Sequence, residues 1–235
     1  MRKALVTFIA VFALAFTPAV AQTDATVTVL HLIPGGPLGL PANLEVDVYA
    51  NDAFLFTFEF TDIIGPLALP AGDYEFEVFV SGADPDTDAP VLTLTESIAA
   101  GDNVDIAAHL TDETGIALSR FDNNATDQLT NPVSPRIASQ SVRVTVRHLA
   151  DFGRVGLNQL GPGITPTLIN GDTLQFDVNP LTARLWLSVA GWERPISFEP
   201  TLNAELMANT AYYIYAIGQP ADGSFQLLIR TVPFN

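Results

Sequence analysis

Three aspartates alternate in the segment DPDTD at positions 84–88. Alternating carboxylates can place several hard oxygen ligands around one cation, and calcium prefers such ligands. The segment departs from an EF-hand loop because Ala89 stands where that loop requires glycine. Aspartate and proline are also ordinary turn residues. The sequence therefore predicts a calcium site at Asp84, Asp86 and Asp88, with a solvated acidic loop as the alternative.

Two tryptophans form a second candidate site, in the segment LWLSVAGW at positions 185–192. In an extended chain, Trp186 and Trp192 share one face, and the aliphatic residues between them share the other. If the aliphatic face belongs to the core, the tryptophans look outward, where they can stack on a sugar ring or dock a partner. The alternative is that a neighbouring domain or loop covers them. We predict a ligand surface at Trp186 and Trp192.

The residues needed for common nucleophilic and zinc chemistry are missing. The chain has three histidines and no cysteine, and it contains neither a Gly-x-Ser-x-Gly nor a His-Glu-x-x-His motif. His31 and His148 recur in similar segments, VTVLHL and VTVRHL, 117 positions apart. Both share strand parity with inward-facing valines, so we interpret them as structural histidines that hydrogen-bond the backbone at a strand end. Pairs of carboxylates remain, and these are all that a glycosidase needs.

The charge distribution is strongly uneven. From Asp24 to Ser119 the sequence has 17 Asp or Glu residues and no Lys or Arg. Without residues 1–21, the chain keeps eight arginines against 26 acidic residues, a formal charge of −18. Such a field repels nucleic acid and anionic membrane surfaces and attracts cations. We expect no nucleic-acid partner, and we interpret most of the acids as a solvated coat.

The elements that position these residues are predicted to be strands. Apolar residues alternate with polar ones in short segments that end at Gly, Pro, Asn or Asp, and no long segment has helical periodicity. The segment FLFTFEF is the clearest case, with Phe54, Phe56, Phe58 and Phe60 expected on one buried face. About seven such strands in about 100 residues match the size of an immunoglobulin-like sandwich. One face of each strand is expected to pack in the core and the other to face solvent.

The pattern starts again after a polar, proline-containing stretch. The repeat of VTVLHL as VTVRHL marks this second beginning. We therefore predict an all-β protein of two tandem immunoglobulin-like antiparallel β-sandwiches, at residues 22–121 and 141–235, joined by a linker at 122–140. A transmembrane β-barrel is the structural rival, but the short strands and long loops do not form a hairpin series.

The first 21 residues have the layout of a cleavable signal peptide. Arg2 and Lys3 precede an apolar stretch, and Ala19-Val20-Ala21 provides small residues for cleavage. The apolar stretch is shorter than the roughly 20 residues that a membrane helix needs. We therefore expect an exported protein, periplasmic or extracellular, with no transmembrane anchor. Without cysteine it has no disulfides to support its core.

Three motifs of the first repeat are similar to one known family. They are His31-Leu32-x-Pro34, the strand Val46-Asp47-Val48-Tyr49 and the turn Pro70-Ala71-Gly72-Asp73-Tyr74. Together they resemble the bacterial exported domain of unknown function 4397. That resemblance covers about Ala25 to Asp122 and implies an immunoglobulin-type sandwich, often in tandem copies, with no established catalytic residue. The second repeat keeps His148-Leu149 and has Asp151 where the proline would fall.

These observations predict a non-enzymatic exported module of the cell envelope or extracellular space, with a binding or structural role and an unknown partner. Calcium is the one cofactor that the sequence suggests. The alternative from another class is a secreted hydrolase that acts on polysaccharide through paired carboxylates. A structural subunit of a surface layer or fibre is a third possibility, and assembly that depends on concentration would reveal it.

Overall fold

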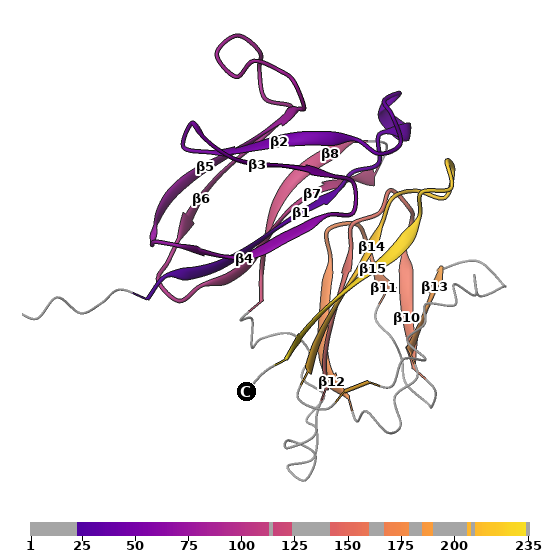
Figure 1. Ribbon diagram of the computed structural model, residues 1–235. Helices are drawn as coiled ribbons and strands as arrows, with labels where there is room; N and C mark the ends of the chain where they lie inside the picture. Colours follow the sequence, from indigo (N-terminus) through magenta and orange to yellow (C-terminus); the bar gives the residue numbers. More distant parts are fainter. Residues whose placement is uncertain are drawn as a thin grey trace, which may run out of the picture.

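The computed structural model describes residues 23–112, 115–123, 142–159, 167–178, 185–189, 206–207 and 210–233 (Figure 1). The predicted signal peptide lies outside these ranges, as do residues 124–141, which make up most of the predicted linker. Within the described ranges, no helix is long and apolar enough to cross a membrane. The all-β class predicted from the alternating segments is confirmed.

The first unit contains eight described strands. These are β1 (Ala25–Leu32), β2 (Glu45–Ala50), β3 (Ala53–Glu59), β4 (Ile63–Leu69), β5 (Gly72–Val80), β6 (Leu92–Ile98), β7 (Asn103–Leu110) and β8 (Ile116–Asp122). They form sheet A, in the order β4-β1-β7-β8, and sheet B, in the order β3-β2-β5-β6. A short 3-10 helix, Gly36–Leu38, lies between β1 and β2.

The second unit contains seven described strands. These are β9 (Val142–His148), β10 (Val155–Gln159), β11 (Thr167–Leu168), β12 (Thr173–Val178), β13 (Leu185–Val189), β14 (Thr210–Ile217) and β15 (Gln226–Pro233). They form sheet C, in the order β12-β9-β14-β15, and sheet D, in the order β11-β10-β13. Sheets A and C share one plan, because β1 runs parallel to β7 and β9 runs parallel to β14. All other pairings are antiparallel within the described strands.

Each unit has its own apolar core between its two sheets. In the first unit, inward residues of sheet A such as Val29 and Ile106 pack against Val48 and Phe76 of sheet B. In the second, Val144 and Ile214 of sheet C share a cluster with Val155 and Leu168 of sheet D. Alternation along each strand sends every second side chain into the core, which is why the apolar segments fold as strands.

A third apolar cluster joins the two units. It is formed by Leu30, Leu32 and Ala107 of the first unit with Leu149, Ala211, Tyr213, Tyr215 and Ile217 of the second. Sheets A and C therefore pack through their outer faces, and the layers follow the order B, A, C, D (Figure 1). The expectation of one solvent-facing side per strand is wrong for β1, β7, β9 and β14, because both faces of these central strands are covered.

Candidate binding surface

The outer face of sheet B combines acidic and aromatic side chains. Strand parity turns Val46, Val48, Phe76 and Val78 inward, and the residues between them therefore point away from the core. The outward set consists of Asp47, Tyr49, Glu75, Glu77 and Phe79, joined by Phe54 of β3 and Thr93 of β6. We call this set the sheet B outer face.

A β-bulge brings Phe54 to this face. Val48 pairs with Phe56, but the next residue, Tyr49, pairs with Phe54, so Leu55 is an extra residue in β3. One extra residue reverses which side chains point inward. Phe56 and Phe58 keep the predicted inward direction, whereas Phe54 is 55% exposed. The prediction of one common buried face for the four phenylalanines is therefore wrong at Phe54.

Phe60 also leaves the predicted common face. It follows the end of β3 and packs against the cluster between sheets A and C, instead of the core between sheets A and B. The strand ends before Phe60, so the alternation that orients Phe56 and Phe58 does not extend to it.

Tyr49 lies at the centre of an aromatic group on the sheet B outer face. Its ring centroid is 5.5 Å from that of Phe54 and 5.3 Å from that of Phe79, with interplanar angles of 70° and 74°. These edge-to-face contacts add to the stability of the group and hold the Tyr49 ring in place. Phe79 is buried, so Tyr49 and Phe54 supply the accessible aromatic surface of the group.

Carboxylates flank the aromatic group. Tyr49 pairs with Phe54 on one side and with Glu77 on the other, and Glu77 pairs in turn with Thr93. Phe54, Tyr49, Glu77 and Thr93 therefore form one row across four strands. Burial raises the pKa of Glu77, and the negative charges of Glu75 and Asp52 raise it further. The row thus lies in a region of negative potential.

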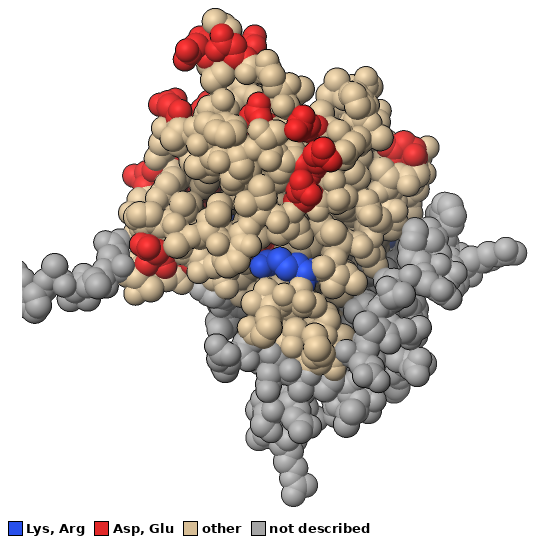
Figure 2. Space-filling model, viewed as in Figure 1, with Lys and Arg blue, Asp and Glu red and all other residues tan. Residues whose placement is uncertain are grey.

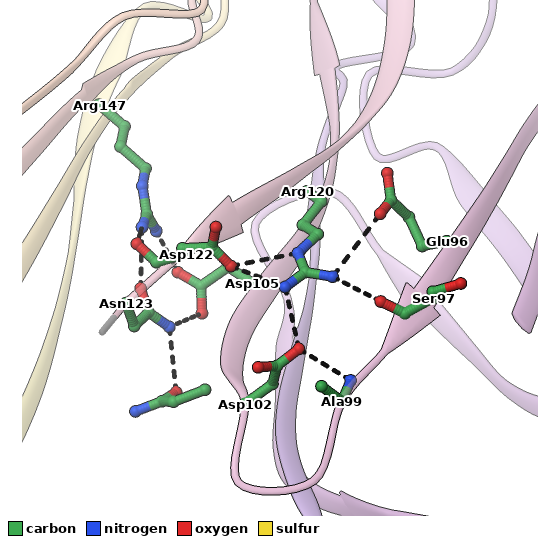
Figure 3. Close-up of polar contacts among 10 residues, drawn as sticks. Glu96, Ser97, Ala99, Asp102, Asp105, Arg120, Asp122, Asn123 and Arg147 are labelled. Carbon is green, nitrogen blue, oxygen red and sulfur yellow. Dashed lines mark hydrogen bonds and ion pairs between the residues drawn. The ribbon is translucent and has the colours of Figure 1, made fainter. Parts of the chain in front are cut away.

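Arg120 is the one Lys or Arg in the described residues of the first unit, and it pairs with acidic residues outside this row (Figure 3). Arg120 donates hydrogen bonds to Asp122 at 2.9 Å, to Asp102 at 3.0 Å and to the Ser97 carbonyl at 2.9 Å. Glu96 lies 3.6 Å from the same guanidinium group. Burial by itself would lower the pKa of Arg120, but Asp122 and Asp102 raise it. Acidic side chains are spread over the visible face of the first unit, as Figure 2 shows.

The three aspartates of the predicted calcium site lie in the turn between β5 and β6. The Asp84 carboxylate accepts a hydrogen bond from the Asp86 N–H at 3.1 Å, and the Asp88 carboxylate accepts one from the Asp84 N–H at 2.9 Å. In the part of the chain that the structure describes, no group of three or more His, Cys, Asp or Glu side chains could hold a metal ion. Calcium binding at this turn stays a prediction.

The two tryptophans of the second predicted surface differ in whether the structure describes them. Trp186 belongs to β13, where it pairs with Asn158 of β10, and Trp192 lies outside the described residues. A ligand surface at Trp186 and Trp192 also stays a prediction.

His31 and His148 are buried, and both hydrogen-bond backbone groups. The Nε2 atom of His31 lies 3.0 Å from the Leu44 carbonyl, and its Nδ1 atom accepts the Ile33 N–H at 3.4 Å. The Nε2 atom of His148 lies 2.7 Å from the Phe152 carbonyl. Burial lowers the pKa of His31 to about 4, although the Leu44 hydrogen bond opposes this. The interpretation of both residues as structural histidines is confirmed.

Sequence reasoning missed a buried polar group between sheets A and C. It consists of Asp105 of β7, Asn123 after β8, Arg147 of β9, Tyr215 of β14 and Arg230 of β15, and we call it the Asp105 clasp. Asp105 and the Arg147 side chain are almost completely buried, and Arg147 donates directly to the carboxylate. The other donors to Asp105 are Arg230 at 2.8 Å, the Tyr215 hydroxyl at 2.6 Å and the Asn123 amide at 2.9 Å.

Aromatic rings surround the two arginines of the Asp105 clasp. The guanidinium carbon of Arg147 lies 4.9 Å from the ring centroid of Phe121, and that of Arg230 lies 4.3 Å from the ring centroid of Tyr213. Burial raises the pKa of Tyr215, and the Asp105 charge raises it further, so the phenol remains a donor. One carboxylate and several ring faces thus hold two cations, of which Arg147 is buried and Arg230 is largely buried.

One sequence signal could have found the Asp105 clasp. When VTVLHL is aligned with VTVRHL, Leu30 corresponds to Arg147, and this position has the parity opposite to the inward valines. An arginine at a position that is leucine in the other repeat indicates an acidic partner. The sequence could not identify Asp105 as that partner, because the first repeat offers 17 acids.

A scan against protein families matches residues 25–158 to a family described as a domain of unknown function (DUF4397). The matched region spans β1 to β9 and enters β10, so it includes residues of both units. A search of curated proteins finds no match.

One similar solved structure is a Bacteroides ovatus protein provisionally described as a cell adhesion protein. It is 7% identical and matches over 92% of this chain and 99% of that chain, with a TM-score of 0.20. At that TM-score the likeness carries no weight for fold or function.

Proposed function

This chain belongs to the family described as a domain of unknown function (DUF4397), and we propose that it is an exported, non-enzymatic binding module of the cell envelope or extracellular space. Its binding surface is the sheet B outer face. The family supplies no catalytic residue, and the sequence contains neither of the two catalytic motifs sought above. Residues 1–21 support export through their basic start, apolar stretch and small residues before Gln22.

The observation that carries this proposal is the exposure of Phe54 beside Tyr49. Most large apolar side chains of the first unit lie in a core or against sheet C, but Phe54 is 55% exposed on the sheet B outer face. Exposed aromatic groups on a rigid sheet are typical of interaction surfaces. Tyr and Phe also lose little conformational entropy on binding, since each has two side-chain torsions.

The test is retention of the mature chain, residues 22–235, by envelope fragments of the producing bacterium at physiological salt. We expect the protein to sediment with the fragments and the variant Phe54→Ser to remain largely in the supernatant. The control variant is Ile169→Ser, because Ile169 is 48% exposed in the second unit, away from the sheet B outer face. That variant should sediment like the unmodified chain.

Two results would contradict the proposal. Equal retention of the Phe54→Ser variant and the unmodified chain would show that this face does not bind the envelope. Failure of the unmodified chain to sediment at any salt concentration would remove the envelope as the location of its partner.

A further inference from the structure

We propose that the sheet B outer face binds an arginine-bearing segment of a protein partner. One arginine side chain stacks on the Tyr49 ring, so that its aliphatic stem contacts Phe54 on one side and Glu77 accepts its hydrogen bonds on the other. This inference rests on the proposed function, because it names the class of partner for the same surface. The row Phe54, Tyr49, Glu77 and Thr93 supplies both parts of the recognition, since Tyr49 has the Phe54 ring on one side and the Glu77 carboxylate on the other.

Charge complementarity selects a cationic partner. No Lys or Arg occurs between Asp24 and Ser119, and Arg120 is held by Asp102 and Asp122. The carboxylates of Glu75 and Glu77 form no ion pair within the described residues. Their repulsion, to which Asp52 adds, is relieved when a cation arrives.

The aromatic rings favour arginine over other cations. A metal ion would use the carboxylates and gain nothing from an edge-to-face pair of rings. A guanidinium group is planar and weakly hydrated, so it stacks on a ring face and donates to a carboxylate at the same time. Lysine is a compact, strongly hydrated charge that lacks this fork of donors.

The molecule already uses this chemistry on the other sheet of the first unit. The outer face of sheet A presents Asp105 beside its cross-strand neighbour Phe121. Tyr213 and Tyr215 of the second unit complete the set of rings around Arg147. That environment holds Arg147 and Arg230, which arrive from the second unit. The sheet B outer face offers the same two kinds of group, but no arginine of the described chain reaches it.

The experiment is a titration of the isotopically labelled mature chain at 150 mM salt, a condition that screens long-range attraction. The probes are the capped peptide Gly-Arg-Gly-Arg-Gly and its lysine counterpart, Gly-Lys-Gly-Lys-Gly. We expect shifts of the NMR signals of Tyr49, Phe54 and Glu77, and tighter binding of the arginine peptide. The variants Phe54→Ser and Glu77→Gln should each weaken its binding by about two- to five-fold, the size expected for one exposed cation–π or ion-pair contact.

The control variant is Asp86→Asn, which removes one negative charge in the turn between β5 and β6, outside the row. It should change the affinity for the arginine peptide by less than about two-fold, because screened charges contribute little at a distance. Equal weakening by Asp86→Asn and Glu77→Gln, or equal binding of both peptides without shifts in the row, would overturn the inference.

Two further outcomes separate the possible failures. If envelope retention requires Phe54 but the arginine peptide shifts no signal in the row, the partner class is wrong and the proposed function stands. Sedimentation equilibrium tests a second copy as the occupant. A mass that rises with concentration and returns to the monomer value in the Phe54→Ser variant would overturn the assignment to a separate protein.

Discussion

The two outer faces of the first unit have similar chemistry and opposite surroundings. On the outer face of sheet A, Asp105 is buried beneath sheet C and receives four donors. On the outer face of sheet B, Glu77 stands beside Tyr49, which separates it from the exposed ring of Phe54, and its charged neighbours are other carboxylates. The same groups are therefore a structural contact where they are covered and an available surface where they are not.

The difference between buried Asp105 and partly exposed Glu77 indicates that the role of a carboxylate depends more on its burial than on its residue type. Removing a partner from a buried ion pair leaves an uncompensated charge in a medium of low polarity, which is strongly destabilising. Removing an exposed carboxylate changes little, because water and salt already screen it. Stability measurements on matched variants can test this contrast.

The largest effect is expected from Asp105→Ala. This variant leaves the buried Arg147 and the largely buried Arg230 without their carboxylate. We expect the free energy of unfolding to fall by about 3–5 kcal/mol, measured by urea denaturation at pH 7. The control is Asp177→Ala, which breaks the exposed pair between Arg143 of β9 and Asp177 of β12 at a cost below about 1 kcal/mol. Equal effects of the two variants would refute the contrast between the faces.

Lowering the pH should reduce the free energy of unfolding through His31, which faces the core between sheets A and B. In the folded chain the pKa of His31 is about 4, below its ordinary value of 6.5, so the unfolded chain binds the proton first as the pH falls. The stability that neutral His31 contributes is complete above pH 6.5 and is lost between pH 6.5 and pH 4, by about 3 kcal/mol in total.

The measurement is urea denaturation at pH 7 and pH 4 of the unmodified chain and of His31→Gln. Burial also lowers the pKa of His109, which contributes in the same direction in both proteins. The difference between the two pH profiles therefore isolates His31. Parallel profiles would show that His31 is not the titrating group.

Calcium binding would change the comparison between the two outer faces. A metal site in the turn between β5 and β6 would be a second place where the first unit attracts cations. Calcium bound at Asp84, Asp86 and Asp88 predicts a rise in the melting temperature. The free energy of unfolding should rise by about 2.7 kcal/mol when calcium is present at a hundred times its dissociation constant. Asp86→Ala should remove this rise. An equal rise with magnesium at matched ionic strength would contradict a calcium site.

The smallest effects are expected on the sheet B outer face. Glu77→Gln should change the free energy of unfolding by less than about 0.5 kcal/mol, since substitutions of exposed residues rarely do more. Phe54→Ser should lower it by about 0.5–1.5 kcal/mol, because it removes the edge-to-face contact with Tyr49. Thermal melts of these variants beside the unmodified chain give the values. A loss above about 2 kcal/mol would show that this face is structural and would undermine the binding tests that use the same variants.

The sequence predicted local features well and distant contacts poorly. Alternation predicted a strand in FLFTFEF, where β3 spans Ala53–Glu59. The repeat of VTVLHL as VTVRHL predicted that the pattern starts again, and these segments lie in the corresponding strands β1 and β9. The bulge at Leu55 was not predicted, because FLFTFEF alternates without interruption and only pairing with β2 reveals the extra residue. The covered outer face of sheet A was also missed, since its partner, β14, follows β7 by about 100 residues and sequence periodicity reports only local order.

The Asp105 clasp is asymmetric between the two repeats. The carboxylate belongs to the first repeat, and both arginines belong to the second, where Arg147 replaces Leu30 of its counterpart. Two first repeats brought face to face would each bury an aspartate with no cation, and two second repeats would oppose their arginines. Opposite charges therefore meet only when a first repeat packs against a second repeat. The sequence divergence of the two repeats thus favours this mixed pairing and disfavours pairing between two identical repeats.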